Sequence, residues 1–178
     1  MRNLFLISLL SCILSCNEDN NQVTTTPVSY LTMSDFYQYS HVDDNGAAYG
    51  SIDLHDWKVS DQFDNATNAL FNFTDTVNYT DAAAATVSLL VCPIPVNSID
   101  NFFINTSSPT VMKMVIIDSV SAVVSQTAIH LNNGNSTLAL AFPDSSYRRN
   151  ATYRLLYKFY DSSRHNYASG HGDIKTQQ

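Results

Sequence analysis

The sequence is poor in glycine and in basic residues. Only five glycines occur in 178 residues, and none lies in a loop of the kind that cradles a phosphate group. Nine Lys and Arg residues stand against 16 Asp and Glu residues, which gives a net charge of −7 at pH 7, and Arg148-Arg149 is the largest basic cluster. These shortages argue against a nucleotide site and against nucleic acid or anionic lipid head groups as partners.

Cysteine is scarce as well, and its placement argues against a disulfide framework. The three cysteines are Cys12, Cys16 and Cys92. Cys12 and Cys16 lie within or directly after the N-terminal apolar run, which leaves Cys92 as the one cysteine in the rest of the chain. Cys92 lies in the apolar run 87–94, so we expect a buried and unreactive side chain. A domain without disulfides depends on its hydrophobic core, which a chain of this length can form.

The N-terminal apolar run is too short to cross a membrane. It covers residues 4–14, follows Arg2, and gives way to the polar sequence Asn17-Glu18-Asp19. A membrane-spanning helix needs roughly 20 apolar residues. A basic residue, a short apolar run and an abrupt polar change are instead typical of a cleaved signal peptide.

The end of this run resembles the lipobox of bacterial lipoproteins. Ile13 and Ser15 occupy its aliphatic and small positions, and Cys16 follows them. The resemblance implies that Cys16 becomes the N-terminus and carries acyl chains, several of which anchor a protein durably in a membrane. Residues 17–19 also resemble the acidic export tag of Bacteroidota-type lipoproteins, which implies the outer membrane of the cell envelope and exposure at the cell surface. Residues 17–27 fit a plain flexible tether equally well.

These features predict a signal peptide at residues 1–15, a lipidated N-terminus and tether at 16–27, and one folded domain at 28–178. A content of 44% hydrophobic and 14% charged residues is typical of a globular domain. Six Asn-x-Ser/Thr sequons leave open the alternative of a eukaryotic secreted glycoprotein. They begin at Asn65, Asn72, Asn78, Asn105, Asn135 and Asn150. A chain rich in Asn, Ser and Thr also produces such triplets by chance.

The domain has the two-residue hydrophobic period of half-buried strands. It is clearest at residues 153–160, where Tyr153 and Leu155 share one side with two further aromatic residues. The other predicted strands are 28–32, 47–59, 69–78, 86–91, 111–117, 120–130, 136–142 and 167–175. Residues 81–85 are the one plausible helical turn, and a loop of small residues is the alternative there. Residues 43–46 end in Asn-Gly and predict a tight hairpin turn, while Pro93, Pro95 and Pro143 are expected to end strands.

Eight or nine short strands separated by turn signals predict an all-β fold, a single antiparallel β-sandwich. Residues 135–175 resemble the last three strands of immunoglobulin-like and fibronectin-type-III-like domains. In those families a tyrosine at the start of the penultimate strand fixes the preceding corner through its hydroxyl group, and the resemblance implies this role for Tyr153 or Tyr147.

The sequence contains no recognisable catalytic or metal-binding motif, so we predict a non-catalytic protein without cofactor or metal. His165 and His171 lie near Asp161 and Asp173 around the last predicted turn, but without the spacing of a metal site. Residues 43–45 offer oxygen ligands of the kind that calcium prefers. A hairpin turn explains the same three residues.

Aromatic residues give the best indication of a binding surface. Tyr37 and Tyr39 would share one face of an extended segment, and Trp57 follows in the next predicted strand region. Such side chains can stack on sugar rings or anchor a protein partner, although packing in the core is the alternative for each.

We therefore expect a lipid-anchored cell-envelope lipoprotein whose β-sandwich is a non-catalytic binding or scaffolding module for a glycan or an envelope protein. The alternatives are a secreted or surface glycan-processing accessory protein or hydrolase, and a eukaryotic secreted glycoprotein.

Overall fold

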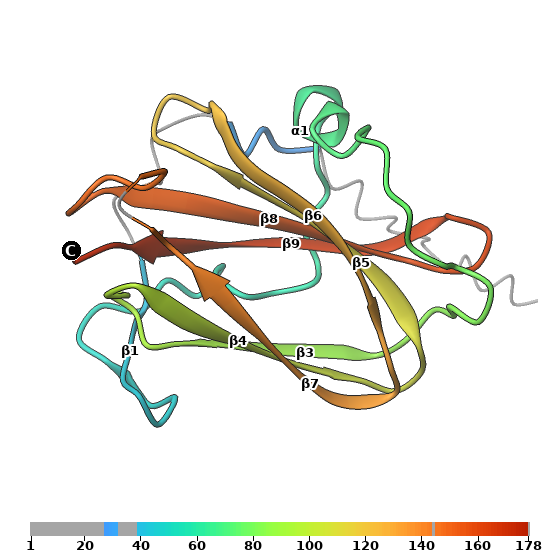
Figure 1. Ribbon diagram of the computed structural model, residues 1–178, viewed down its shortest axis with the longest axis horizontal. Coiled ribbons are helices and arrows are strands. Elements are labelled where there is room, and N and C mark those ends of the chain that lie inside the picture. The colour runs from blue at the N-terminus through green and yellow to red at the C-terminus, as the bar shows by residue number, and fades with distance from the viewer. Residues whose placement is uncertain (1–26, 32–38, 144, 178) are drawn as a thin grey trace, which may run out of the picture.

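Two antiparallel sheets pack face to face in the computed structural model, which describes residues 27–31, 39–143 and 145–177 (Figure 1). One sheet has the strand order β3-β4-β7 and the other β6-β5-β8-β9, and a small separate hairpin consists of β1 and β2. The elements are β1 (His41–Val42), β2 (Ala48–Tyr49), α1 (Asn65–Ala69), β3 (Val87–Cys92), β4 (Ile99–Thr106), β5 (Thr110–Ile117), β6 (Val123–Leu131), β7 (Gly134–Ala141), β8 (Thr152–Tyr160) and β9 (Asn166–Lys175). The predicted β-sandwich is confirmed.

The chain passes repeatedly from one sheet to the other. The β3-β4 hairpin lies in one sheet and the β5-β6 hairpin in the other, β7 returns to pair with β4, and β8 crosses back to pair with β5. These crossing connections join the two antiparallel sheets of the β-sandwich. The corner before β8 has the tyrosine that the resemblance implied. The Tyr153 hydroxyl accepts a hydrogen bond of 2.6 Å from the backbone N–H of Arg148, and Tyr147 packs edge-on against the Tyr153 ring.

The main core fills the space between the sheets. It includes Phe102 from β4, Met112 from β5 and Tyr157 from β8, all of them buried. Each large apolar side chain that is fully buried contributes roughly 1.5–3 kcal/mol to folding. The predicted alternation along β8 is confirmed, because Tyr153 and Leu155 belong to this core while Leu156 belongs to a second one.

The second core lies on the outer side of the four-stranded sheet. Phe63 and Phe71 from the segment before β3 pack there on Val115, Ile117 and Leu156. Both faces of this sheet are therefore covered, which explains why all eight residues of β5 are buried. Among the described residues no helix is long and apolar enough to span a membrane.

Several predicted elements are wrong. Residues 81–85 form the loop of the two alternatives and no helical turn. The short helix is α1, which Asp64 caps by accepting a 2.8 Å hydrogen bond from the Thr67 backbone N–H. The strand predicted at residues 69–78 is absent, since Ala69 belongs to α1, residues 70–71 form a turn, and residues 72–78 alternate in burial without pairing with a neighbouring strand. Residues 28–31 contribute only a bridge at Val28, residues 47–59 only β2, and β4 was not predicted at all.

The predicted turn and strand ends are confirmed. Asp43 Oδ1 accepts hydrogen bonds from the backbone N–H groups of Asn45 and Ala47, at 2.9 and 2.8 Å, and Gly46 adopts a positive φ of 80°. This turn connects β1 and β2. Strand β3 ends immediately before Pro93, and β7 ends two residues before Pro143.

Candidate functional site

The outer side of the three-stranded sheet is open to solvent over the described residues, in contrast to the covered four-stranded sheet. Strand β4 runs along its middle, with Phe102 and Ile104 facing the core and Phe103 facing outward. Phe103 and Leu90 are each 40% exposed, and Ile99 is 55% exposed. We call this outer side of β3, β4 and β7 the open face. It exposes these three large apolar side chains among polar ones, and we treat it as the candidate binding surface.

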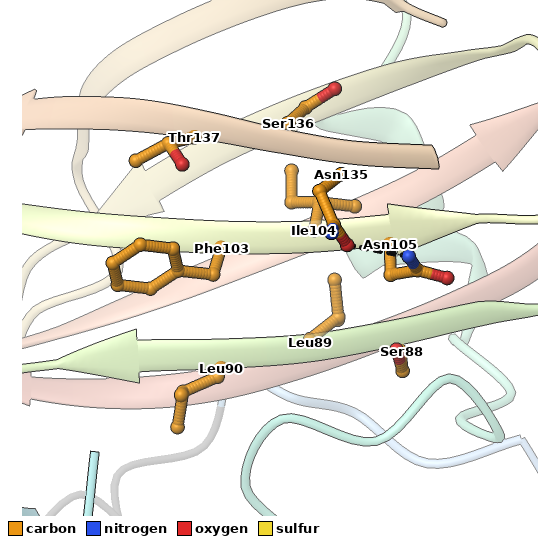
Figure 2. A pocket seen from close by; sticks show the side chains of 9 residues that line it. All are labelled: Ser88, Leu89, Leu90, Phe103, Ile104, Asn105, Asn135, Ser136 and Thr137. Carbon is orange, nitrogen blue, oxygen red and sulfur yellow. Dashed lines mark hydrogen bonds between the residues drawn. The ribbon is translucent and has the colours of Figure 1, made fainter. Parts of the chain in front are cut away.

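Cross-strand pairing arranges the open face in two rows (Figure 2). An apolar row combines Leu90, Phe103 and Thr137, which are direct partners across the three strands. A polar row one step along combines Ser88, Asn105 and Asn135. The two rows border a shallow groove of about 390 Å³. None of the nine residues that line the groove is charged, so the groove is suited to a neutral ligand.

The two asparagines of the polar row hold each other in place. Asn105 Nδ2 donates a hydrogen bond of 2.5 Å to Asn135 Oδ1 (Figure 2). A side-chain amide has two N–H donors and an oxygen that accepts two hydrogen bonds. The pair therefore keeps both donors and acceptors for a ligand, on amides whose orientation is already restricted.

The β1-β2 turn forms a wall of the open face next to β3. A Cβ atom added to Gly46 would lie 2.8 Å from Leu90 Cδ2, so the turn backbone rests directly against the Leu90 side chain. The positive φ of Gly46 favours glycine at this position, and an added side chain would also displace the end of the Leu90 side chain. Asp43 and Asp44 precede it in the same turn.

The aromatic residues selected from the sequence do not form this surface. Tyr37 lies outside the described residues, and Tyr39 is half-buried with its ring 4.6 Å from that of His41. Trp57 packs on the main core, 5.8 Å from Phe102 between ring centroids. For Trp57, the structure therefore shows packing in the core, which was the alternative to an exposed binding role. The exposed ring of the open face is that of Phe103, on a strand that the sequence did not predict, and Tyr49 in β2 is exposed as well.

A network of charged side chains lies in the protein interior rather than at a surface. Arg154 donates to both carboxylate oxygens of Asp173, at 2.7 and 2.8 Å. Asp56 accepts backbone hydrogen bonds from Ser40 and Asp173, each 3.1 Å long, and burial together with the Asp173 charge raises the pKa of Asp56 to about 7. Burial also raises the pKa of Asp173, while Arg154 opposes this. The network connects the loop around Asp56 to β8 and β9, which is a structural role.

The two histidines near the last turn, His165 and His171, have different carboxylate partners. His171 Nδ1 lies 2.5 Å from Asp61, whereas the exposed His165 lies 3.9 Å from Asp161. Within the part of the chain that the structure describes, no group of three His, Cys, Asp or Glu side chains is placed to hold a metal ion. Cys92 is buried, as predicted, and burial raises the pKa of its thiol. Cys16 lies outside the described residues.

Comparison with known proteins assigns no family. No protein-family model matches the chain, and no curated protein matches it. Among solved structures, the dimeric latent PorU from Porphyromonas gingivalis is similar over 54% of this chain, with 15% sequence identity and a TM-score of 0.44. The matched part covers 10% of that PorU chain. The likeness is one of a mostly β-strand segment.

Proposed function

We propose that this protein is a lipid-anchored module of the cell envelope that binds uncharged glycans on its open face without cleaving them. One observation carries the proposal: an exposed aromatic ring lies beside a fixed pair of amides in a groove without charged residues. Phe103 supplies the ring, and Asn105 with Asn135 supplies the amides.

This combination matches the surface chemistry of a sugar. A pyranose ring has an apolar face of C–H groups, which can lie on the Phe103 and Leu90 side chains, and an edge of hydroxyl groups. Each hydroxyl both donates and accepts hydrogen bonds. The Asn105–Asn135 pair likewise has N–H donors and amide oxygens that remain available to a ligand. Apolar contacts together with a few fixed polar groups are the usual composition of a small-ligand site.

A protein partner is favoured less by the same surface. Protein interfaces are enriched in Tyr, Trp, Phe, Met and Arg, and Phe103 is the one such residue in the two rows of the open face. A stable protein interface also buries about 800 Å² on each partner. On the open face, small polar side chains alternate with apolar ones, which is not the pattern of a continuous interface of that size.

The lipid anchor is supported by the sequence around Cys16. The intact mass and the N-terminal peptide mass of the protein from its native cells test it, and we expect a chain that begins at acylated Cys16. A Cys16→Ala variant should leave the membrane fraction. An unmodified N-terminus, with hexose at the sequons, would instead establish a secreted glycoprotein.

Affinity electrophoresis of the detergent-solubilised protein tests the binding function. Gels should contain laminarin, mannan, starch or hydroxyethyl cellulose as neutral polysaccharides, and polygalacturonate as an anionic one. We expect at least one neutral polysaccharide to retard the protein, with loss of retardation in Phe103→Ala and Asn105→Ala. Val120→Ala is the matched control, because Val120 is 77% exposed in the β5-β6 turn.

Three outcomes would contradict the proposal. Release of reducing sugar from the retarding polysaccharide would indicate a hydrolase. Equal retardation of the Phe103→Ala and wild-type proteins would place the site elsewhere. Migration unaffected by every polysaccharide, together with recovery of one stoichiometric envelope protein that requires Phe103, would assign the open face to a protein partner.

A further inference from the structure

We propose that the open face recognises the interior of a linear, uncharged polysaccharide chain that lies along β4, an inference that rests on the proposed glycan-binding function. The geometry points to this ligand because the outward residues of β4 form a row along the strand, not a pocket around one point. In order, these residues are Ile99, Asn101, Phe103 and Asn105.

The row alternates apolar and amide side chains at a regular interval. Outward residues of an antiparallel strand are about 7 Å apart, so Asn101 and Asn105 are separated by about 14 Å and the whole row extends about 20 Å. Phe103 lies midway between the two asparagines. One sugar ring on Phe103 would thus have an amide before it and an amide after it along the same chain.

Disaccharide and longer ligands are distinguished by this length. A disaccharide that fills the groove contacts Phe103 and Asn105 but does not reach Asn101, whereas a tetrasaccharide can contact Asn101, Phe103 and Asn105 together. The structure therefore predicts that affinity increases with chain length until the whole row is occupied.

The small side chains of β7 leave the row accessible beyond the groove. Its outward residues decrease in size from Asn135 and Thr137 to Ala139 and Ala141. Ala139 is the partner of Asn101, and Ala141 is the partner of Ile99. A site for a chain end would need a side chain that closes one end of the groove. Here alanines continue the surface toward Ile99.

The charges near the open face favour a neutral chain over an acidic one. Asp43 and Asp44 belong to the turn whose Gly46 backbone rests on Leu90. Cys92 lies at the end of β3 and is the cross-strand partner of Asn101. Burial and the Asp100 charge are the larger causes of the raised pKa of the Cys92 thiol, and the carboxylates of Asp43 and Asp44 are near enough to raise it further. A uronic acid or sulfated sugar at Asn101 would meet this negative potential.

Isothermal titration with oligosaccharides of the retarding polysaccharide, from two to six units, tests the proposal. We expect affinity to rise at least about 10-fold between the disaccharide and the tetrasaccharide, which corresponds to about 1.4 kcal/mol. Borohydride reduction of the chain end should leave the affinity of the hexasaccharide unchanged, because the interior is bound.

The Asn101→Ala variant locates the chain on β4. It should weaken binding of the tetrasaccharide by about 5- to 10-fold, as expected for loss of one hydrogen-bonding amide, and leave binding of the disaccharide unchanged. Asn101→Ser serves as a second variant, and a thermal unfolding curve for each shows that the fold is intact. Val120→Ala is again the control outside the open face.

The possible results separate this inference from the proposed function. Equal affinity for disaccharide and hexasaccharide, with loss of both in Phe103→Ala, would keep the glycan-binding function and overturn the extended site. Loss of binding on borohydride reduction, or no effect of Asn101→Ala and Asn101→Ser on the tetrasaccharide, would also overturn it. No binding of any polysaccharide or oligosaccharide would overturn both.

Discussion

Replacement of Asp100 by Asn should stabilise the protein at neutral pH and have little effect in acid. The Asp100 side chain points from β4 into the core and is fully buried, and neither carboxyl oxygen has a hydrogen-bond partner. Burial raises the pKa of this carboxyl from 3.8 to about 7. Asn has nearly the same shape and cannot ionise.

The sign of the pH dependence follows from the raised pKa. The folded protein holds the Asp100 proton more tightly than the unfolded chain does. The contribution of this carboxyl to the free energy of unfolding of the wild type is therefore fully present below about pH 4. It is lost as the pH rises toward 7, and it stays lost above that pH. A shift from 3.8 to about 7 corresponds to about 4 kcal/mol at 1.36 kcal/mol per pH unit. This is an upper limit, since the surroundings of a buried carboxylate relax when it ionises.

Urea unfolding of both proteins at several pH values between 4 and 8 measures this effect. The quantity to compare is the difference in unfolding free energy between Asp100→Asn and wild type at each pH. We expect a small difference at pH 4 that grows by about 2–4 kcal/mol up to pH 7 and then levels off. Asp56 and Asp173 also have raised pKa values, but both are present in the two proteins and cancel in the difference.

Asp44→Asn is the control, because Asp44 is exposed in the β1-β2 turn, and it should change stability by no more than about 0.5 kcal/mol at each pH. A difference between Asp100→Asn and wild type that is constant from pH 4 to pH 8 would refute the reasoning. So would greater stabilisation by Asn in acid than at neutral pH.

Three further variants test the packing around β8 and β9. Arg154→Ala should lower the free energy of unfolding by about 3–5 kcal/mol, because it leaves the Asp173 carboxylate buried without the Arg154 cation. A loss below about 1 kcal/mol in urea unfolding would show that water reaches this pair. Tyr153→Phe should cost about 1 kcal/mol in the same assay through loss of the corner hydrogen bond, and no loss would remove the corner from the account of stability. Gly172→Ala should lower the free energy of unfolding by about 1–3 kcal/mol through overpacking, since its Cβ would lie 2.5 Å from the Trp57 ring. It should also alter the fluorescence of this single tryptophan. An unchanged spectrum and stability would contradict the close packing.

Strands whose two sides differ in polarity were predictable from the sequence. Strand β8 is an example, because its alternation is regular and a polar turn follows it. Residues 72–78 have a similar alternation, yet they form no strand. The carbonyl groups of Phe71 and Phe73 lie near the Lys113 ammonium group, at 3.5 and 3.1 Å. Periodicity reports which side of an extended segment is buried, whereas pairing depends on what lies beside it in space.

The candidate site depended on a strand whose alternation is ambiguous. In β4, one set of alternate residues contains Ile99 and Phe103 with two asparagines, and the other contains Phe102 and Ile104 with Asp100 and Thr106. Each set has two apolar and two polar members. Hydrophobicity therefore cannot decide which side faces the core, and a shift by one residue would exchange them.

The polar residues explain the side that the fold adopts. With the observed side inward, Thr106 is satisfied by a 2.9 Å hydrogen bond to the Asn132 carbonyl, and Asp100 alone remains without a partner. The opposite side would bury two amides in the core, where each unpaired amide costs about 1–3 kcal/mol. Exposure of Phe103 between two amides and burial of the Asp100 carboxyl are thus two results of one choice of register. If the register is retained because it presents Asn101, Phe103 and Asn105 to a ligand, Asp100→Asn should raise stability at neutral pH and leave the affinity for the glycan unchanged.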